Sequence, residues 1–349
     1  MSLKGDQPSR ELPSLGQWLS HPIPNFLLWR SQQVPPSFSA EQPWRWFLPF
    51  LVVAPMLAIA GVVHKTSMIF PEGAALSFGV FVLCIPGWTV SRWRLIVVLP
   101  IAALMGMGLS VLNLPLSLAM ILGITGVLIL LHVLRSLLAP SLSAALIPIL
   151  FHIHSWFYPS TVLGVSIAVT VIGVLVSRSA PKAPRPVILN ERFALTFKFF
   201  IIAVLWISVA TVLHLPAATL APPLFVSTYD VAKGTTSFPL EVGRALLFFA
   251  LGFTGVVMLS LMHSDAFAGL LTFTIGLSYM AIARRYHPPI LSVALLALIV
   301  GHVVDWKFGL CLMVGSLSLY AINGAVEFVT LRVFKISSFS STLTVSAEE

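Results

Sequence analysis

Long apolar stretches follow one another from about residue 47 to residue 330. Most of them contain about the 20 residues that an α-helix needs to cross the hydrocarbon core of a bilayer. Only 9% of the residues are charged, whereas soluble domains carry roughly 25%. The sequence therefore predicts an all-α, polytopic membrane protein with about 12 transmembrane or re-entrant segments. They span about residues 47–63, 73–90, 95–112, 115–134, 138–154, 159–177, 197–214, 218–238, 242–262, 265–283, 288–304 and 308–330.

Two of these segments differ from the others. The segment at 138–154 is short and flanked by prolines, and the segment at 218–238 contains Asp230, Lys233 and several prolines. Irregular backbone at membrane depth is tolerated only where protein or a water-filled cavity surrounds it. We therefore expect that either segment is a broken or re-entrant helix.

The basic residues lie in the short loops between the segments. If successive segments cross the membrane in alternate directions, all but three of the 20 lysines and arginines fall on one side. Lys65 and Lys307 fall on the other side, and Lys233 lies within a segment. The positive-inside rule then places both termini in the cytoplasm and the chain in the cytoplasmic (cell) membrane. We interpret the net charge of +8 as a topology signal, so no nucleic acid is expected as a partner.

The sequence matches itself when it is shifted by 150 residues. Apolar membrane sequences resemble one another in general, but the matched positions mostly carry rarer residues such as histidine and arginine. Each copy contains six segments, an even number, so both copies enter the membrane from the same side as two parallel six-segment repeats. The matched pairs are His64 and His214, Arg94 and Arg244, Gly126 and Gly276, Arg135 and Arg285, His152 and His302, and Trp156 and Trp306.

The repeat divides the chain into five parts. Residues 46–177 form repeat A and residues 195–332 form repeat B, and a basic cytoplasmic linker at 178–194 joins them. Residues 1–45 form a cytoplasmic or interfacial tail without the features of a cleaved signal peptide. Residues 333–349 form a cytoplasmic C-terminal tail.

The sequence contains no phosphate-binding loop, zinc-protease helix or nucleophile elbow. Cys84 and Cys311 lie inside apolar runs, where a thiol behaves as a small hydrophobic group, so we expect neither a disulfide nor a metal site. We therefore predict that the chain is not an enzyme and holds no cofactor.

Residues 283–316 read ARRYHPPILSVALLALIVGHVVDWKFGLCLMVGS. A basic pair and His-Pro-Pro open an apolar helix that ends in His, Asp and Trp, and in this pattern the chain resembles the HPP family of integral membrane proteins. The resemblance covers residues 195–330 well and 45–177 more loosely, because the first copy reads RSLLAPSL where His-Pro-Pro would fall. Some members of that family are implicated in moving nitrite across chloroplast or cyanobacterial membranes. The resemblance thus implies a carrier or channel for a small solute, such as a small anion like nitrite.

The start of the His-Pro-Pro helix is the first candidate for a substrate-binding site. Prolines are tolerated in a first helical turn because the missing N–H groups are unpaired there in any case. If the helix starts within the membrane, its free N–H groups and positive dipole end would favour an anion. Alternatively, the arginines are topology markers and the histidine caps an interfacial loop. The candidates are His287, Pro288, Pro289, Arg284 and Arg285, with Arg135 and Pro140 as their counterparts in repeat A.

Two acids and two histidines complete the candidate substrate-binding residues. Intramembrane ionisable residues are costly and usually face a cavity or a partner, so Glu72 and Asp230 would couple protons or pair with a basic residue, unless both lie in outer loops. His152 and His302 each precede a tryptophan by four residues and share a helix face with it. They belong either to an interfacial aromatic belt or to a titratable site near the outer mouth.

Two other functions stay open beside a carrier for a small solute. A membrane enzyme acting on lipid-linked substrates would need His152, His302, Glu72 and Asp230 to converge on one face near headgroup depth. In a membrane scaffold, no polar cavity would reach the bilayer midplane, and the paired residues would only pack against their neighbours. The expected partners are the lipid bilayer and the solute, and a homo-oligomer is compatible with each function.

Overall fold

The structure is a computed structural model, and it describes residues 43–85, 88, 92–176, 189–232, 238–283, 286–301 and 305–345. Every regular element in these ranges is helical. The predicted N-terminal tail, apart from its last three residues, and the linker before residue 189 lie outside them, as do Lys233, Arg284, Arg285 and His302. The last helix continues to Val345, well past the expected start of the C-terminal tail at residue 333.

Eight helices of the described part are long and apolar enough to cross a membrane. Their outward faces carry large apolar side chains such as Val133 and Leu175, which are 68% and 71% exposed. Such faces are stable in lipid and unfavourable in water. The chain is therefore a polytopic helical membrane protein. The eight are α3 (Phe50–Val63, preceded by the short helix Pro43–Phe47), α6 (Arg92–Val111), α7 (Leu116–Val133), α9 (Phe157–Val176), α10 (Leu189–Val212), α12 (Phe238–Leu261), α13 (Asp265–Ala283) and α15 (Lys307–Val345).

Four further helices are short and almost wholly buried: α4 (Glu72–Phe81), α8 (Pro140–Leu150), α11 (Pro222–Val231) and α14 (Pro289–Val300). With 10 to 12 residues each, they are about 15–18 Å long, or about half of a hydrocarbon core. Two of them lie in the segments expected to be broken, 138–154 and 218–238. The segments at 73–90 and 288–304 also contain shorter helices than predicted. α4 ends at Phe81 although the apolar residues Val82 and Leu83 that follow are still buried, and α14 ends at Val300 because Gly301 adopts a φ of 79°, outside the helical range.

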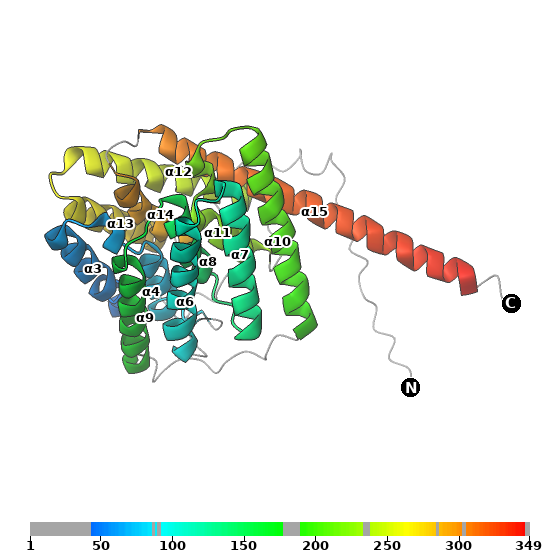
Figure 1. Ribbon diagram of the computed structural model, residues 1–349, viewed down its shortest axis with the longest axis horizontal. Coiled ribbons are helices and arrows are strands. Elements are labelled where there is room, and N and C mark those ends of the chain that lie inside the picture. The colour runs from blue at the N-terminus through cyan, green and yellow to red at the C-terminus, as the bar shows by residue number, and fades with distance from the viewer. Residues whose placement is uncertain are drawn as a thin grey trace. The chain divides into compact units, whose positions relative to one another are not determined.

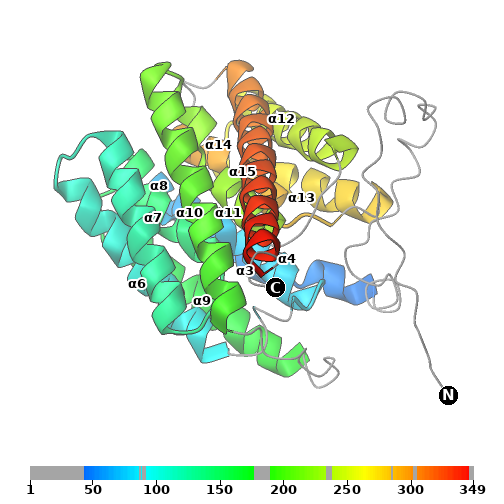
Figure 2. The ribbon, with the colours of Figure 1, turned by 90° about the vertical axis from the view of Figure 1, so that its right-hand side faces the viewer.

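The helices of the first half and those of the second half pair in the same way. The contact between α7 and α10, one helix from each half, can be followed in both views (Figures 1 and 2). α6 packs on α7, α8 and α9, and α12 packs on α13, α14 and α15. Across the halves, α3 packs on α13 as α10 packs on α7, and α4 packs on α14 as α11 packs on α8. The first long helix of each half, α3 or α10, therefore packs on a helix of the other half. The four short helices contact one another between the halves.

Two glycines 149 residues apart lie where a long helix of each half packs on a short one. A Cβ atom added to Gly106 of α6 would lie 2.0 Å from the carbonyl oxygen of Ala145 in α8. One added to Gly255 of α12 would lie 3.4 Å from the carbonyl oxygen of Ala294 and 3.0 Å from the Cβ of Ala297, both in α14. Each long helix thus reaches a short buried helix through a position without a side chain.

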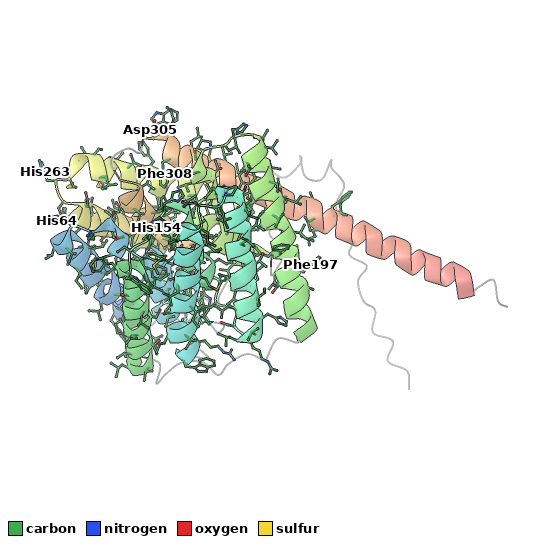
Figure 3. The ribbon with its side chains drawn as sticks, in the orientation of Figure 1. His64, His154, Phe197, His263, Asp305 and Phe308 are labelled. Atoms are coloured by element: carbon green, nitrogen blue, oxygen red, sulfur yellow. The ribbon has the colours of Figure 1, made fainter. Side chains whose placement is uncertain are left out.

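Polar contacts join the loops at each end of the bundle. The Lys65 ammonium after α3 lies 5.9 Å from the Phe157 ring centroid at the start of α9, and the Ser110 hydroxyl in the last turn of α6 donates to the Ile153 carbonyl oxygen after α8. His64 and His263, from the loops after α3 and α12, line one pocket of about 490 Å³ (Figure 3). The Arg94 guanidinium donates to the carbonyl oxygen of Arg135, which follows α7.

Candidate functional site

The start of α4 places an acid deep in the bundle. Ile69 and Phe70 are buried, and the helix begins at Glu72 directly after Pro71. Glu72 itself is 0% exposed, and neither of its carboxyl oxygens has a hydrogen-bond partner. No ion pair of the described residues includes it. The predicted pairing with arginine or Lys233 is therefore not found within the described part of the chain.

Three hydroxyl groups from three other helices surround this acid. Ser143 in α8 and Ser292 in α14 interact with the carboxyl group, and Tyr158 at the start of α9 lies within electrostatic range of it. All three side chains are buried, and none of their hydroxyl groups meets hydrogen-bond geometry with a partner. We call Glu72, Ser143, Tyr158 and Ser292 the Glu72 cluster.

The described protein atoms alone do not satisfy the hydrogen-bonding groups of the Glu72 cluster. Leaving one buried polar group without a partner costs about 1–3 kcal/mol, and more for a charged group. Five such atoms gather here, from four residues that lie 15 to 220 positions apart in the sequence. A water molecule, a proton or a small cation shared by the carboxyl and hydroxyl groups would satisfy them.

The second half holds a different polar group, which we call the Arg244 cluster: Ser227, Glu241, Arg244 and His287. Arg244 and Glu241, one turn apart on α12, form a buried ion pair. The Ser227 hydroxyl of α11 lies 2.8 Å from His287 Nε2, and the Phe248 ring packs edge-on against the imidazole. Arg244 is within electrostatic range of both His287 and Asp230. This cluster is internally paired, whereas the Glu72 cluster is not.

Helix α14 connects the two clusters. His287 lies two residues before its first residue, Pro289, and Ser292 lies in its first turn. A shift of α14 along its axis would therefore change the surroundings of Glu72 and of Arg244 together.

The expectation of free N–H groups at the His-Pro-Pro helix is wrong. Pro288 and Pro289 have no N–H group, and the next two amides, of Ile290 and Leu291, donate to the carbonyl oxygens of His287 and Pro288. In α8, Pro140 again lacks the group, and the amides of Ser141 and Leu142 donate to the carbonyl oxygens of Leu138 and Ala139. The tight first turns consume the donors that an anion would need.

The predicted site residues do not come together in one place. His287, Pro288, Pro289 and Pro140 are buried, whereas Arg135 and His152 are exposed in the turns after α7 and α8. Trp156 is 69% exposed, as a member of an interfacial belt would be. Asp230 is half-buried in α11, in the Arg244 region rather than beside Glu72. Arg284, Arg285 and His302 lie outside the described residues.

The sequence interpretation missed Ser143, Tyr158 and Ser292 because single serines and tyrosines are common in apolar helices. One signal was present: Ser143 and Ser292 are 149 residues apart, close to the repeat interval, and each lies three residues after a helix-starting proline. Nothing in the spacing links either serine to Glu72. Only the packing of α4 against α8 and α14 does so.

Similarity to known proteins assigns no function to these two clusters. The HPP resemblance depends on the pattern at residues 283–316, and two of its basic residues lie outside the described part. Membership of that family therefore stays a prediction. Neither the protein families nor the curated proteins and solved structures with which the chain was compared match it.

Proposed function

We propose that the chain is a proton-coupled secondary carrier, and that the Glu72 cluster is its proton-binding site. The observation that carries the proposal is the group of five partnerless polar atoms at the meeting point of α4, α8, α9 and α14. Intramembrane ionisable groups of this kind commonly belong to ion or proton pathways. Binding of a proton removes the negative charge of Glu72, and its loss restores that charge, so the cluster has two states that favour different surroundings.

The proposed architecture consists of two parallel six-segment halves related by an axis along the membrane normal, with the four short helices as re-entrant segments. It is supported by the repeated helix pairings, by the matched Gly106 and Gly255 contacts, and by the joined loop ends. Alternate crossing of successive segments would place Arg94 and Arg135 at one end, and Lys65 at the other. By the positive-inside rule, the former end and both termini would face the cytoplasm of the cell membrane.

The proposed solute is a small anion, and nitrite is the example that the HPP resemblance suggests. Arg244 and His287 support this choice, because they are basic groups buried beside the start of α14. Glu241 already compensates Arg244, so an anion would have to compete with that ion pair. Carrying a proton on Glu72 together with an anion would keep the net charge moved across the membrane small.

Two observations weigh against the alternative functions. The enzyme hypothesis requires His152, His302, Glu72 and Asp230 to converge on one face. His302 lies outside the described residues, but His152 is exposed in a turn, and Glu72 is fully buried whereas Asp230 lies within electrostatic range of Arg244. The scaffold hypothesis gives no reason for five partnerless polar atoms buried at the centre. A carrier fits both observations.

Uptake into proteoliposomes tests the proposal. Labelled nitrite and a panel of other small anions are offered to vesicles with and without an inward proton gradient. We expect gradient-driven uptake by the wild type, none by Glu72→Gln, and unchanged uptake by Glu327→Gln, whose carboxyl lies 3.7 Å from the Lys198 ammonium at the bundle periphery. Uptake no greater than that of empty vesicles under every gradient would refute the carrier, and full activity of Glu72→Gln would refute the assigned site.

A further inference from the structure

A small cavity beside the Arg244 cluster has no role in the proposed function. It lies between α11, α12 and α15, and the volume open to the centre of a water-sized sphere is about 10 Å³. A cavity needs on the order of 10–15 Å³ by this measure to hold one water molecule. It therefore admits a single small particle and excludes nitrite and larger solutes. We call it the Asn323 cavity; Ser227, Thr228, Glu241, Ser316, Leu319, Tyr320 and Asn323 line it.

All the polar side chains that line the Asn323 cavity offer oxygen atoms. They are three aliphatic hydroxyl groups, one phenol, one carboxyl and one amide. Among the described lining residues there is no lysine, arginine or histidine. Hard cations prefer such oxygen ligands, whereas anions need donors with positive charge.

The oxygen atoms that line the cavity do not all have partners within the described protein atoms. Asn323 is only 3% exposed, and its Oδ1 atom has no hydrogen-bond partner. The Thr228 hydroxyl donates its proton to the Leu224 carbonyl oxygen, which leaves its lone pairs for another ligand. The Ser227 hydroxyl is engaged by His287 Nε2 and also keeps acceptor capacity. A cation would satisfy these oxygens without needing any further acceptor.

The charge of the site selects the type of cation. Glu241 is the one acidic residue among the described lining residues, and it also forms the ion pair with Arg244. Asp230 also lies within electrostatic range of Arg244, so Glu241, Asp230 and Arg244 together carry one net negative charge. A monovalent ion balances this charge, whereas a divalent ion such as calcium, whose sites usually combine several carboxylates, would exceed it. A single-particle cavity also fits sodium better than the larger potassium ion.

We propose that the Asn323 cavity binds one sodium ion, held by the oxygens of Ser227, Thr228, Glu241, Ser316, Tyr320 and Asn323. The inference builds on the proposed carrier and names its second ion. Sodium at Ser227 would order the side chain that holds His287, and His287 leads directly into α14. The ion would thus stabilise one position of α14, the helix whose Ser292 lies beside Glu72.

Thermal unfolding of the purified full chain tests sodium binding without any transport measurement. Sodium chloride is titrated at constant ionic strength, with potassium chloride or choline chloride as replacement. A ligand that binds only the folded state raises Tm in a saturable way, so we expect a saturable rise with sodium and none with potassium or choline. Asn323→Leu and Ser316→Ala should each abolish the rise, and the matched control Ser166→Ala, a buried serine of α9 outside both clusters, should retain it.

Equal Tm in the three salts would overturn the proposal, and the cavity would then hold a water molecule only. A sodium-dependent rise that persists in both Asn323→Leu and Ser316→Ala would also overturn it, because the ion would bind elsewhere. Should Asn323→Leu fail to fold, Ser316→Ala alone decides, and ²²Na⁺ binding to the wild type should then saturate at one ion per chain. A sodium-dependent rise in Tm without any anion uptake would refute the carrier but not the sodium site. Anion uptake without a sodium-dependent rise in Tm would refute the sodium site but not the carrier.

Discussion

The two halves of the bundle share their helix pairings but differ in the polar residues at matching positions. Glu72 at the start of α4 corresponds, 150 residues later, to Pro222 at the start of α11. Conversely, Asn323 of α15 corresponds to Gly173 of α9, which packs against Val80. The first half therefore holds a partnerless acid and the second half a paired, oxygen-rich site. If the halves arose by duplication, packing was kept while each site acquired its own chemistry.

Two arginines 150 residues apart also lie in different surroundings. Arg244 is 3% exposed and pairs with a buried acid on its own helix. Arg94 lies at the end of the bundle and donates to the Arg135 backbone. The same residue type at equivalent points of two helices can thus have different environments, because the neighbouring side chains decide whether a charge is buried.

The largest expected effect distinguishes the two glycine contacts. Gly106→Ala places a methyl group 2.0 Å from the Ala145 carbonyl oxygen, and rigid backbone cannot give way cheaply. We expect the free energy of unfolding to fall by at least about 3 kcal/mol. In Gly255→Ala the nearest atom is 3.0 Å away, so overpacking and the gain in helix propensity should leave the change within about 1 kcal/mol of zero. Folded yield and Tm in detergent measure both, and equal losses would contradict the contact geometry.

The next effect distinguishes the two arginines. Arg244→Ala leaves Glu241 as a buried charge without its ion-pair partner, which costs about 3–5 kcal/mol. Arg94→Ala removes a backbone hydrogen bond at the periphery and should cost about 0.5–1.5 kcal/mol. Chemical unfolding of each variant gives these values. The double variant Arg244→Met with Glu241→Leu should recover most of the loss, and failure to recover would show that the ion pair is not the cause.

Glu72→Gln separates function from stability in the first half. The substitution removes a carboxyl group that has no partner among the described protein atoms, so Tm should stay the same or rise. Uptake driven by a proton gradient should nevertheless be lost. A parallel fall in Tm and uptake would instead mean that Glu72 supports the fold.

The smallest expected effect concerns the ion pair between Lys198 of α10 and Glu327 of α15, which are 3.7 Å apart and partly exposed. Peripheral pairs contribute about 0–1 kcal/mol. A double-mutant cycle with Lys198→Met and Glu327→Gln should therefore give a coupling energy in that range. A larger coupling would show that this pair, which joins two elements of the second half, does more than neutralise charge.

Much of the fold was predictable from the sequence because hydropathy is a local property. Each apolar range contains a helix in the structure, and the prolines near residues 138 and 222 indicated two of the short helices. The two other short helices were not predicted, since their flanking residues are also apolar. The predicted site was only partly useful: Glu72 and His287 are buried polar residues of two clusters, whereas Arg135 and His152 lie in exposed turns.

The amino-acid sequence is enough to show that this chain folds in lipid as many helices, because each segment is long and apolar enough for the bilayer and pairs its own backbone groups as a helix. Which polar side chains meet depends on the tertiary structure. Glu72, Ser143, Tyr158 and Ser292 come from four helices, and their proximity depends on how α4, α8, α9 and α14 pack. It also decided that proline-started helices have no free N–H groups at their first turns, since this depends on backbone hydrogen bonds rather than on residue type. Helix formation follows local chemistry, whereas a site is created by contacts between distant parts of the chain.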